Sequence, residues 1–172
     1  MVSAVVLAAG ASTRFGSPKQ HVLLPRVLLA LGTSAVGDVV VVAGAHALEI
    51  DARIVNCDDW ERGPGASLRC GLHALSEDAE AAVIVLADGP RLDPRAVDRL
   101  IDAWRSGAGD RLAASYDGRT RSHPVLLARS AWAEIPDEGA RSLRVSLISC
   151  EDLTAPGDVD TREGLRAGDG ES

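Results

Sequence analysis

The sequence predicts a three-layer α/β/α fold around a mainly parallel sheet, and two observations support this fold class. Short apolar runs rich in valine recur along the chain and end at glycine or other loop-forming residues, which is typical of parallel strands buried on both faces. Segments with helical start and stop signals separate these runs. Because strands alternate with helices, the sheet should be mainly parallel, with helices covering both of its faces.

The length of the chain predicts its domain organisation. The chain has 172 residues, which is the size of one ordinary domain. No internal repeat, low-complexity tract or linker divides the sequence. We therefore expect a single domain over residues 1–165, followed by a frayed tail at residues 166–172.

The first half of the chain alternates regularly between the two kinds of element. Strands are expected at residues 2–7, 38–43, 52–55 and 81–87, and helices at residues 26–34, 67–75 and 94–105. The last of these helices has the clearest signals, because Pro94 suits a first helical position and Gly107 follows its end. The second half adds expected strands at residues 111–116, 124–127 and 145–150, and helices at residues 130–135 and from residue 139.

Composition excludes several classes of function. Eighteen Lys and Arg residues against 25 Asp and Glu residues give a net charge of −7, which argues against a general nucleic-acid-binding surface. The opening apolar run is too short for a signal peptide or a membrane-spanning helix. We expect a cytoplasmic protein with no nucleic-acid or membrane partner. Cys57, Cys70 and Cys150 have no zinc-site spacing and are expected to be inert thiols.

The loop after the first expected strand is a candidate ligand site, because open α/β sheets bind ligands outside the carboxyl ends of their strands. Residues 8–19 combine small residues and hydroxyl side chains with Arg14 and Lys19, the only lysine of the chain. Exposed backbone N–H groups and two cations suit a polyphosphate. The loop lacks the GK[ST] ending of a Walker A motif, and a purely structural turn is the alternative.

A second candidate lies after the fourth expected strand, where Asp88 begins an Asp-Gly-Pro turn. Mg²⁺ takes one or two carboxylates together with phosphate oxygens, so an aspartate at the tip of a buried strand is a suitable ligand. The alternative is an aspartate that only begins a turn or caps a helix.

Several motifs in order along the chain resemble one family. LAAGASTRFGSPKQ at residues 7–20 is similar to the LAAG-x-S-x-R-x-G-x-x-K pattern of nucleotidyltransferases with a glycosyltransferase-A-like Rossmann fold. Asn56 with the following WERGPGASLRCGL stretch, LADGP at residues 86–90 and HPVLL at residues 123–127 resemble the branch related to molybdenum cofactor cytidylyltransferase. DEGAR at residues 137–141 and DVDT at residues 158–161 are similar to its later motifs.

The resemblance implies a reaction in which the terminal phosphate of molybdopterin attacks the α-phosphorus of CTP and releases pyrophosphate. It implies that the nucleotide is bound by Leu7, Ala8, Ala9, Gly10, Ser12, Arg14, Lys19, Asn56 and Ser67. It implies that Mg²⁺ is held by Asp88 and Asp160, that the acceptor lies near His123 and Asp137, and that Arg14, Lys19 and Asp88 are catalytic. The implied partners are CTP and a molybdopterin-type acceptor, with a molybdenum enzyme as a candidate recipient of the product.

Three departures from the family pattern keep alternatives open. Pro25 leads almost directly into the first expected helix, Gly89 stands where the family often has a polar residue, and Arg162 interrupts the closing motif. One alternative is an accessory protein that binds a nucleotide without transferring it. Another is a transferase acting on a sugar phosphate or another alcohol phosphate. The resemblance places the base against Ala9, where related guanylyltransferases carry glycine. The Cβ of Ala9 therefore predicts a preference for CTP over GTP.

Overall fold

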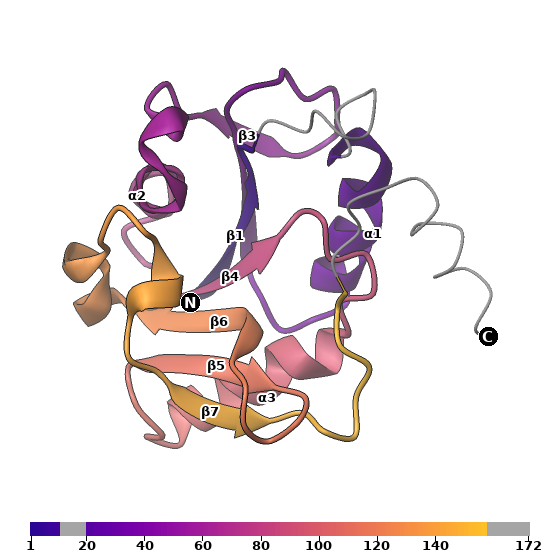
Figure 1. Ribbon diagram of the computed structural model, residues 1–172, viewed down its shortest axis with the longest axis vertical. Coiled ribbons are helices and arrows are strands. Elements are labelled where there is room, and N and C mark those ends of the chain that lie inside the picture. The colour runs from indigo at the N-terminus through magenta and orange to yellow at the C-terminus, as the bar shows by residue number, and fades with distance from the viewer. Residues whose placement is uncertain (11–19, 158–172) are drawn as a thin grey trace.

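The computed structural model describes residues 1–10 and 20–157, which contain a seven-stranded sheet in the order β3-β2-β1-β4-β6-β5-β7 (Figure 1). The strands are β1 (Val2–Ala8), β2 (Asp38–Ala43), β3 (Arg53–Asn56), β4 (Ala81–Leu86), β5 (Arg111–Ser115), β6 (Ser122–Ala128) and β7 (Ser146–Ser149). Each strand overlaps a segment that the sequence predicts as a strand, because these runs carry apolar residues toward both faces of the sheet.

The sheet is mainly parallel, as predicted, with one strand reversed. Strands β3, β2, β1 and β4 pair in parallel, and β5 pairs in parallel with β7. Strand β6 is antiparallel to both β4 and β5. Its first residues therefore lie at the edge of the sheet where β4 ends.

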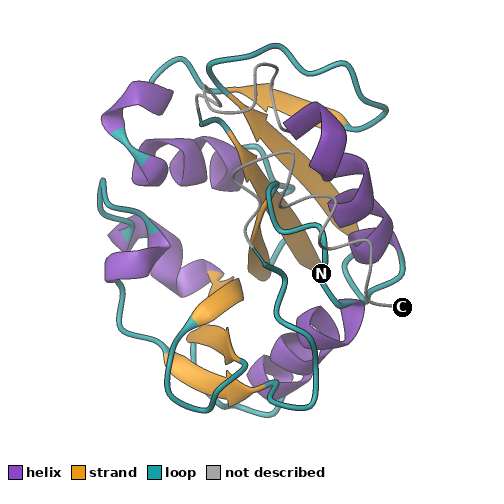
Figure 2. Cartoon of the chain, turned by 45° about the vertical axis from the view of Figure 1, so that its right-hand side comes forward, coloured by secondary structure: helices purple, strands orange, loops and turns teal. Residues whose placement is uncertain are grey.

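Helices cover both faces of the sheet, which confirms the three-layer architecture (Figure 2). Helices α1 (Gln20–Gly32) and α3 (Pro94–Arg105) pack on one face, and α2 (Pro64–His73) packs on the other. Short 3₁₀ turns η2 (Trp60–Arg62), η3 (Arg129–Glu134) and η4 (Ala140–Ser142) join these elements. Alternate residues of β1 belong to the two apolar clusters, since successive strand side chains point to opposite faces. None of the described helices is long and apolar enough to cross a membrane.

Four of the five expected helices differ from the structure. Helix α1 begins at Gln20 and includes Pro25, whereas the sequence predicts a start after that proline. The cost of an internal proline is offset by the packing of Leu23, Leu24 and Val27, which are fully buried. Helix α2 begins three residues earlier than predicted, because Gly63 adopts a φ of 123° before it and Pro64 occupies its first turn. The two expected helices after residue 129 are the short turns η3 and η4.

The prediction of inert thiols is wrong for two of the three cysteines. Cys57, directly after β3, and Cys70, on α2, form a disulfide with a Cα–Cα distance of 6.0 Å. Cys150 is a buried free thiol, as expected. The sequence spacing does not indicate the pair, because the approach of the two residues depends on how α2 packs back against β3.

Candidate active site

Three parallel strands, β3, β1 and β4, bring the described candidate residues to one edge of the sheet. Asn56 ends β3, Ala9 and Gly10 follow β1, and Asp88 follows β4. Neighbouring strands lie about 4.8 Å apart. Asn56 is two strands away from Ala8, in register with it through Ala43 of β2, so the two residues lie about 10 Å apart. Asp88 belongs to the strand directly beside β1 on the other side. Ser12, Arg14, Lys19 and Asp160 lie outside the described residues.

Backbone contacts join the loop after β1 to its neighbours. The N–H of Ala87 donates to the carbonyl oxygen of Leu7 at 3.1 Å, which fixes the start of the Asp88 turn against β1. The N–H of Ala45 donates to the carbonyl oxygen of Ala9 at 3.4 Å. Ala8 and Ala9 are buried, with Ala9 only 6% exposed, whereas Gly10 is exposed. Residues 8–10 therefore offer backbone groups more than side chains to a ligand.

Gly44 is a site residue that the sequence reasoning missed. A Cβ at this position would lie 2.7 Å from the carbonyl oxygen of Ala9 and 2.6 Å from Cγ of Trp60. Only a residue without a side chain lets these two segments approach so closely. The available signal was a glycine placed directly after a buried strand. Gly44 thus holds together the loops after β1 and β2 and the turn η2.

His123 lies beside the Asp88 turn because β6 runs antiparallel to β4. The register pairs Ile84 with Val125, which puts the start of β6 next to the end of β4. Burial lowers the pKa of His123 to about 4, and the nearby Asp88 carboxylate opposes this shift only in part. The imidazole is therefore neutral at pH 7. Its Nδ1 atom is buried and has no hydrogen-bond partner among residues 1–10 and 20–157.

The His123 ring also explains Gly89, which departs from the family pattern. A Cβ at residue 89 would lie 2.6 Å from Cε1 and 2.9 Å from Nε2 of His123, and 3.1 Å from Cβ of Pro156. The imidazole thus occupies the space that a side chain at residue 89 would need. The departure reflects local packing against the ring, so it does not by itself favour a non-catalytic protein.

Gly89→Ala is expected to destabilise the protein by about 1–3 kcal/mol, because the added methyl group overpacks a buried site. The same substitution in a His123→Ala background should cost much less, since the ring that it meets is gone. Urea denaturation of the parent, both single variants and the double variant gives the coupling energy. If the stability losses of the two single variants simply add up to the loss of the double variant, the predicted contact between a side chain at residue 89 and the His123 ring is contradicted.

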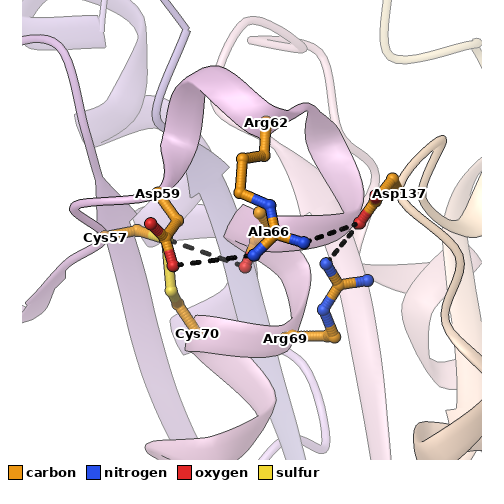
Figure 3. Close-up of a disulfide and its surroundings, with 7 residues drawn as sticks. All are labelled: Cys57, Asp59, Arg62, Ala66, Arg69, Cys70 and Asp137. Carbon is orange, nitrogen blue, oxygen red and sulfur yellow. Dashed lines mark hydrogen bonds and ion pairs between the residues drawn. A yellow bond between two sulfur atoms is a disulfide. The ribbon is translucent and has the colours of Figure 1, made fainter.

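Asp137 lies against the N-terminal half of α2 and is engaged by arginines (Figure 3). Its carboxylate oxygen Oδ1 lies 2.6 Å from Arg69 and 3.9 Å from Arg62. The hydrogen bond from Arg69 is the main reason that the pKa of Asp137 lies below its ordinary value. The backbone of the same loop also binds the helix, because the N–H of Gly65 donates to the Asp137 carbonyl oxygen at 2.9 Å. An acceptor role for Asp137 stays a prediction.

Two further predicted residues differ in exposure. Ser67, on α2, is 4% exposed, and Asn56 is exposed at the carboxyl edge.

Arg121 is a residue that the sequence reasoning missed. Its guanidinium donates to the carbonyl oxygens of Ala140 and Leu143 at 2.7 and 2.6 Å, which ties the η4 turn to the start of β6, two residues before His123.

The Asp88 carboxylate suits a magnesium ion. Among the described residues, no group of three or more His, Cys, Asp or Glu side chains could hold a metal ion on its own. Mg²⁺ does not require such a cage, because it binds one or two carboxylates together with substrate phosphates and water. A half-buried aspartate at the tip of β4, beside the β1 loop, matches that mode of binding.

Comparisons with known proteins agree with this architecture. The bifunctional protein GlmU of Sorangium cellulosum is 32% identical over 129 residues, which are 63% of this chain and 27% of that protein. The chain thus spans about a quarter of the length of this curated relative. The solved structure of Rv0371c from Mycobacterium tuberculosis is 25% identical with a TM-score of 0.77, and the match covers 96% of each chain. Rv0371c has also been solved in complex with manganese.

A further solved structure has the same fold at lower identity. Molybdopterin-guanine dinucleotide biosynthesis protein A from Archaeoglobus fulgidus is 17% identical with a TM-score of 0.68, and the match covers 97% of this chain and 95% of that one. The predicted nucleotidyltransferase type of fold is therefore confirmed. Residues 4–150 match the MobA-like NTP transferase domain. Because this match extends over most of the chain and includes residues 4–8 of β1 and all of the other six strands, the chain belongs to the MobA-like NTP transferase family.

Proposed function

We propose that this protein transfers CMP from CTP to the terminal phosphate of a molybdopterin-type acceptor and releases pyrophosphate. The observation that carries the proposal is the placement of Asp88, beside the end of β1 and His123, at the carboxyl edge of the sheet. The family match supports nucleotide chemistry at this edge. The motifs around Asn56 and His123 support the molybdopterin branch. A molybdenum enzyme that receives the product is the further partner proposed.

The proposed transfer needs positioning and charge neutralisation more than covalent catalysis. An oxygen of the acceptor phosphate forms a bond to the α-phosphorus of CTP. The bond from that phosphorus to the bridging oxygen breaks, and pyrophosphate leaves with the electron pair. Asp88 would hold Mg²⁺, which when bound neutralises negative charge on the phosphates. Because the imidazole of His123 is neutral, it places no positive charge beside Asp88 that would repel the Mg²⁺ ion.

Arg14 and Lys19 are proposed to bind the triphosphate. Opposite unit charges about 4 Å apart attract by roughly 4 kcal/mol at an effective dielectric constant of about 20. Two such cations near the departing pyrophosphate would therefore strengthen both binding and transfer. The lysine suits this role as a compact point charge on a flexible stem.

Lys19→Ala and Arg14→Ala should each weaken CTP binding about tenfold or more in the presence of Mg²⁺, because each removes a charge from the triphosphate site. Isothermal titration measures the affinity, and the rise in melting temperature on adding CTP gives a second readout. Arg105→Ala is the matched control, since Arg105 ends α3 near the start of β4, at the opposite edge of the sheet. Unchanged affinity in both loop variants would contradict the assignment.

CTP is expected to bind more tightly than GTP by at least roughly 1–3 kcal/mol, because a purine placed against Ala9 would leave a buried hydrogen bond unmade. Ala9→Gly should reduce this difference in binding free energy between CTP and GTP. Ala9 is buried, so the variant also loses packing in the core. That loss affects both nucleotides equally and leaves the difference interpretable. A competition titration checks this prediction, and tighter GTP binding to the parent protein would contradict it.

A further inference from the structure

The disulfide closes a segment that contains Ser67 and directly follows Asn56, which are two of the nine residues proposed to bind the nucleotide. Cys57 directly follows Asn56, and Cys70 lies three residues after Ser67 on α2. The 13-residue separation between the cysteines includes the turn η2 and the first two turns of α2. The bond therefore fixes the end of β3 relative to the helix that packs beside it.

The two cysteine residues differ in exposure. Cys57 is 2% exposed, whereas Cys70 is half-buried on α2. An external thiolate can therefore reach Sγ of Cys70 more readily than Sγ of Cys57. Attack there would release Cys57 as the leaving thiolate. The geometry suits exchange that begins at Cys70.

The reduced form has favourable contacts already in place. Sγ of Cys57 lies 3.6 Å from the carbonyl oxygen of Ala66, so a thiol at residue 57 can donate a hydrogen bond to that oxygen. The N–H of Cys57 donates to the Ala43 carbonyl oxygen at 2.8 Å. The ion pair of Arg69 with Asp137 also holds α2 without the disulfide. Reduction should therefore loosen the segment without unfolding the protein.

We propose that Cys57 and Cys70 form a reversible thiol–disulfide pair that controls the order of residues 56–73 and, through it, nucleotide affinity. The second half of this proposal depends on the proposed function. Oxidation by a low-molecular-weight disulfide converts the two thiols into one disulfide and the oxidant into two thiols. The exchange passes through a mixed disulfide at Cys70, so no other electron acceptor is needed. Disulfides in reducing compartments are usually of this transient, sensing kind.

The oxidised form is expected to bind nucleotide more tightly than the reduced form. The disulfide holds Asn56 and Ser67 in one arrangement before the ligand binds. Binding therefore loses less conformational entropy in ordering the segment. We expect CTP affinity to fall about fivefold or more on reduction. A fivefold change is at the lower end of the changes in affinity that coupling between two sites usually produces. We also expect faster amide hydrogen exchange across residues 56–73 in the reduced protein.

The test compares the full-length protein after treatment with oxidised glutathione and after treatment with dithiothreitol. Alkylation with mass spectrometry counts free thiols, hydrogen exchange follows residues 56–73, and titration with CTP and Mg²⁺ gives affinity. Cys70→Ser should bind CTP like the reduced parent and ignore dithiothreitol. Cys150→Ala is the matched control, because Cys150 is buried and free, and it should keep the full response.

Three results would overturn the proposal. These are two free thiols at residues 57 and 70 after oxidation, reduction that occurs only together with global unfolding, and equal exchange and equal CTP affinity in the two forms. If neither form binds any nucleoside triphosphate, the proposed function fails. In that case hydrogen exchange still decides whether the cysteine pair controls the segment.

Discussion

Asp88→Asn is expected to lower the rate of CMP transfer by at least about 10³-fold, while the fold and much of the nucleotide affinity persist. The substitution keeps the size of the side chain and removes the charge that would hold Mg²⁺. The loss of one interaction that stabilises charge in the transition state is enough to slow a reaction by about this factor. Pyrophosphate release at saturating CTP and acceptor, measured over a range of Mg²⁺ concentrations, gives the effect.

Asp102→Asn is the matched control for this variant. Asp102 is an exposed residue of α3, so the control makes the same chemical change away from the carboxyl edge and should retain full turnover. Circular dichroism and CTP titration of both variants separate a catalytic loss from a folding defect. Parent-like turnover by Asp88→Asn at limiting Mg²⁺ would exclude the metal role.

Gly65→Ala is expected to destabilise the protein by about 2–4 kcal/mol. A Cβ at this position of α2 would lie 1.8 Å from the carbonyl oxygen of Pro136 and 2.8 Å from the Cα atom of Asp137. Both atoms belong to the backbone, so the whole loop must move away. That movement would also break the hydrogen bond from the Gly65 N–H to Asp137. Urea denaturation measures the loss as a lower midpoint.

Gly32→Ala provides the contrast to Gly65→Ala. Gly32 is also helical, at the end of α1, but a Cβ there meets no atom of the described residues within 4 Å. Alanine favours a helix by up to about 1 kcal/mol over glycine, so this variant should be neutral or slightly stabilised. A similar midpoint for the two variants would mean that the loop at residues 136–139 does not pack on α2 as described.

The regular elements could be predicted from the sequence where local signals agree. Helix α3 has the predicted bounds, because Asp93 caps it and Pro94 begins it. Valine-rich runs indicate the central strands, because a strand buried on both faces of a sheet is apolar along its whole length. The start of α1 could not be predicted, since packing of its leucines overrides the signal from Pro25. The turns η3 and η4 are too short to show a helical period.

The candidate site could be predicted only in part. Asp88 and the β1 loop follow from the rule that ligands bind at the carboxyl ends of parallel strands. The approach of His123 to Gly89 depends on the reversed direction of β6, which no local pattern encodes. The disulfide between Cys57 and Cys70 likewise depends on tertiary packing.

The most direct test of the central claim measures pyrophosphate release with each nucleoside triphosphate against each candidate acceptor, in the presence of Mg²⁺. The acceptors are molybdopterin carrying its terminal phosphate, a set of sugar phosphates and a buffer blank. We expect release with CTP and molybdopterin, together with formation of the cytidine dinucleotide product. Release only with sugar phosphates, or nucleotide binding without release for every acceptor, would contradict the proposed reaction.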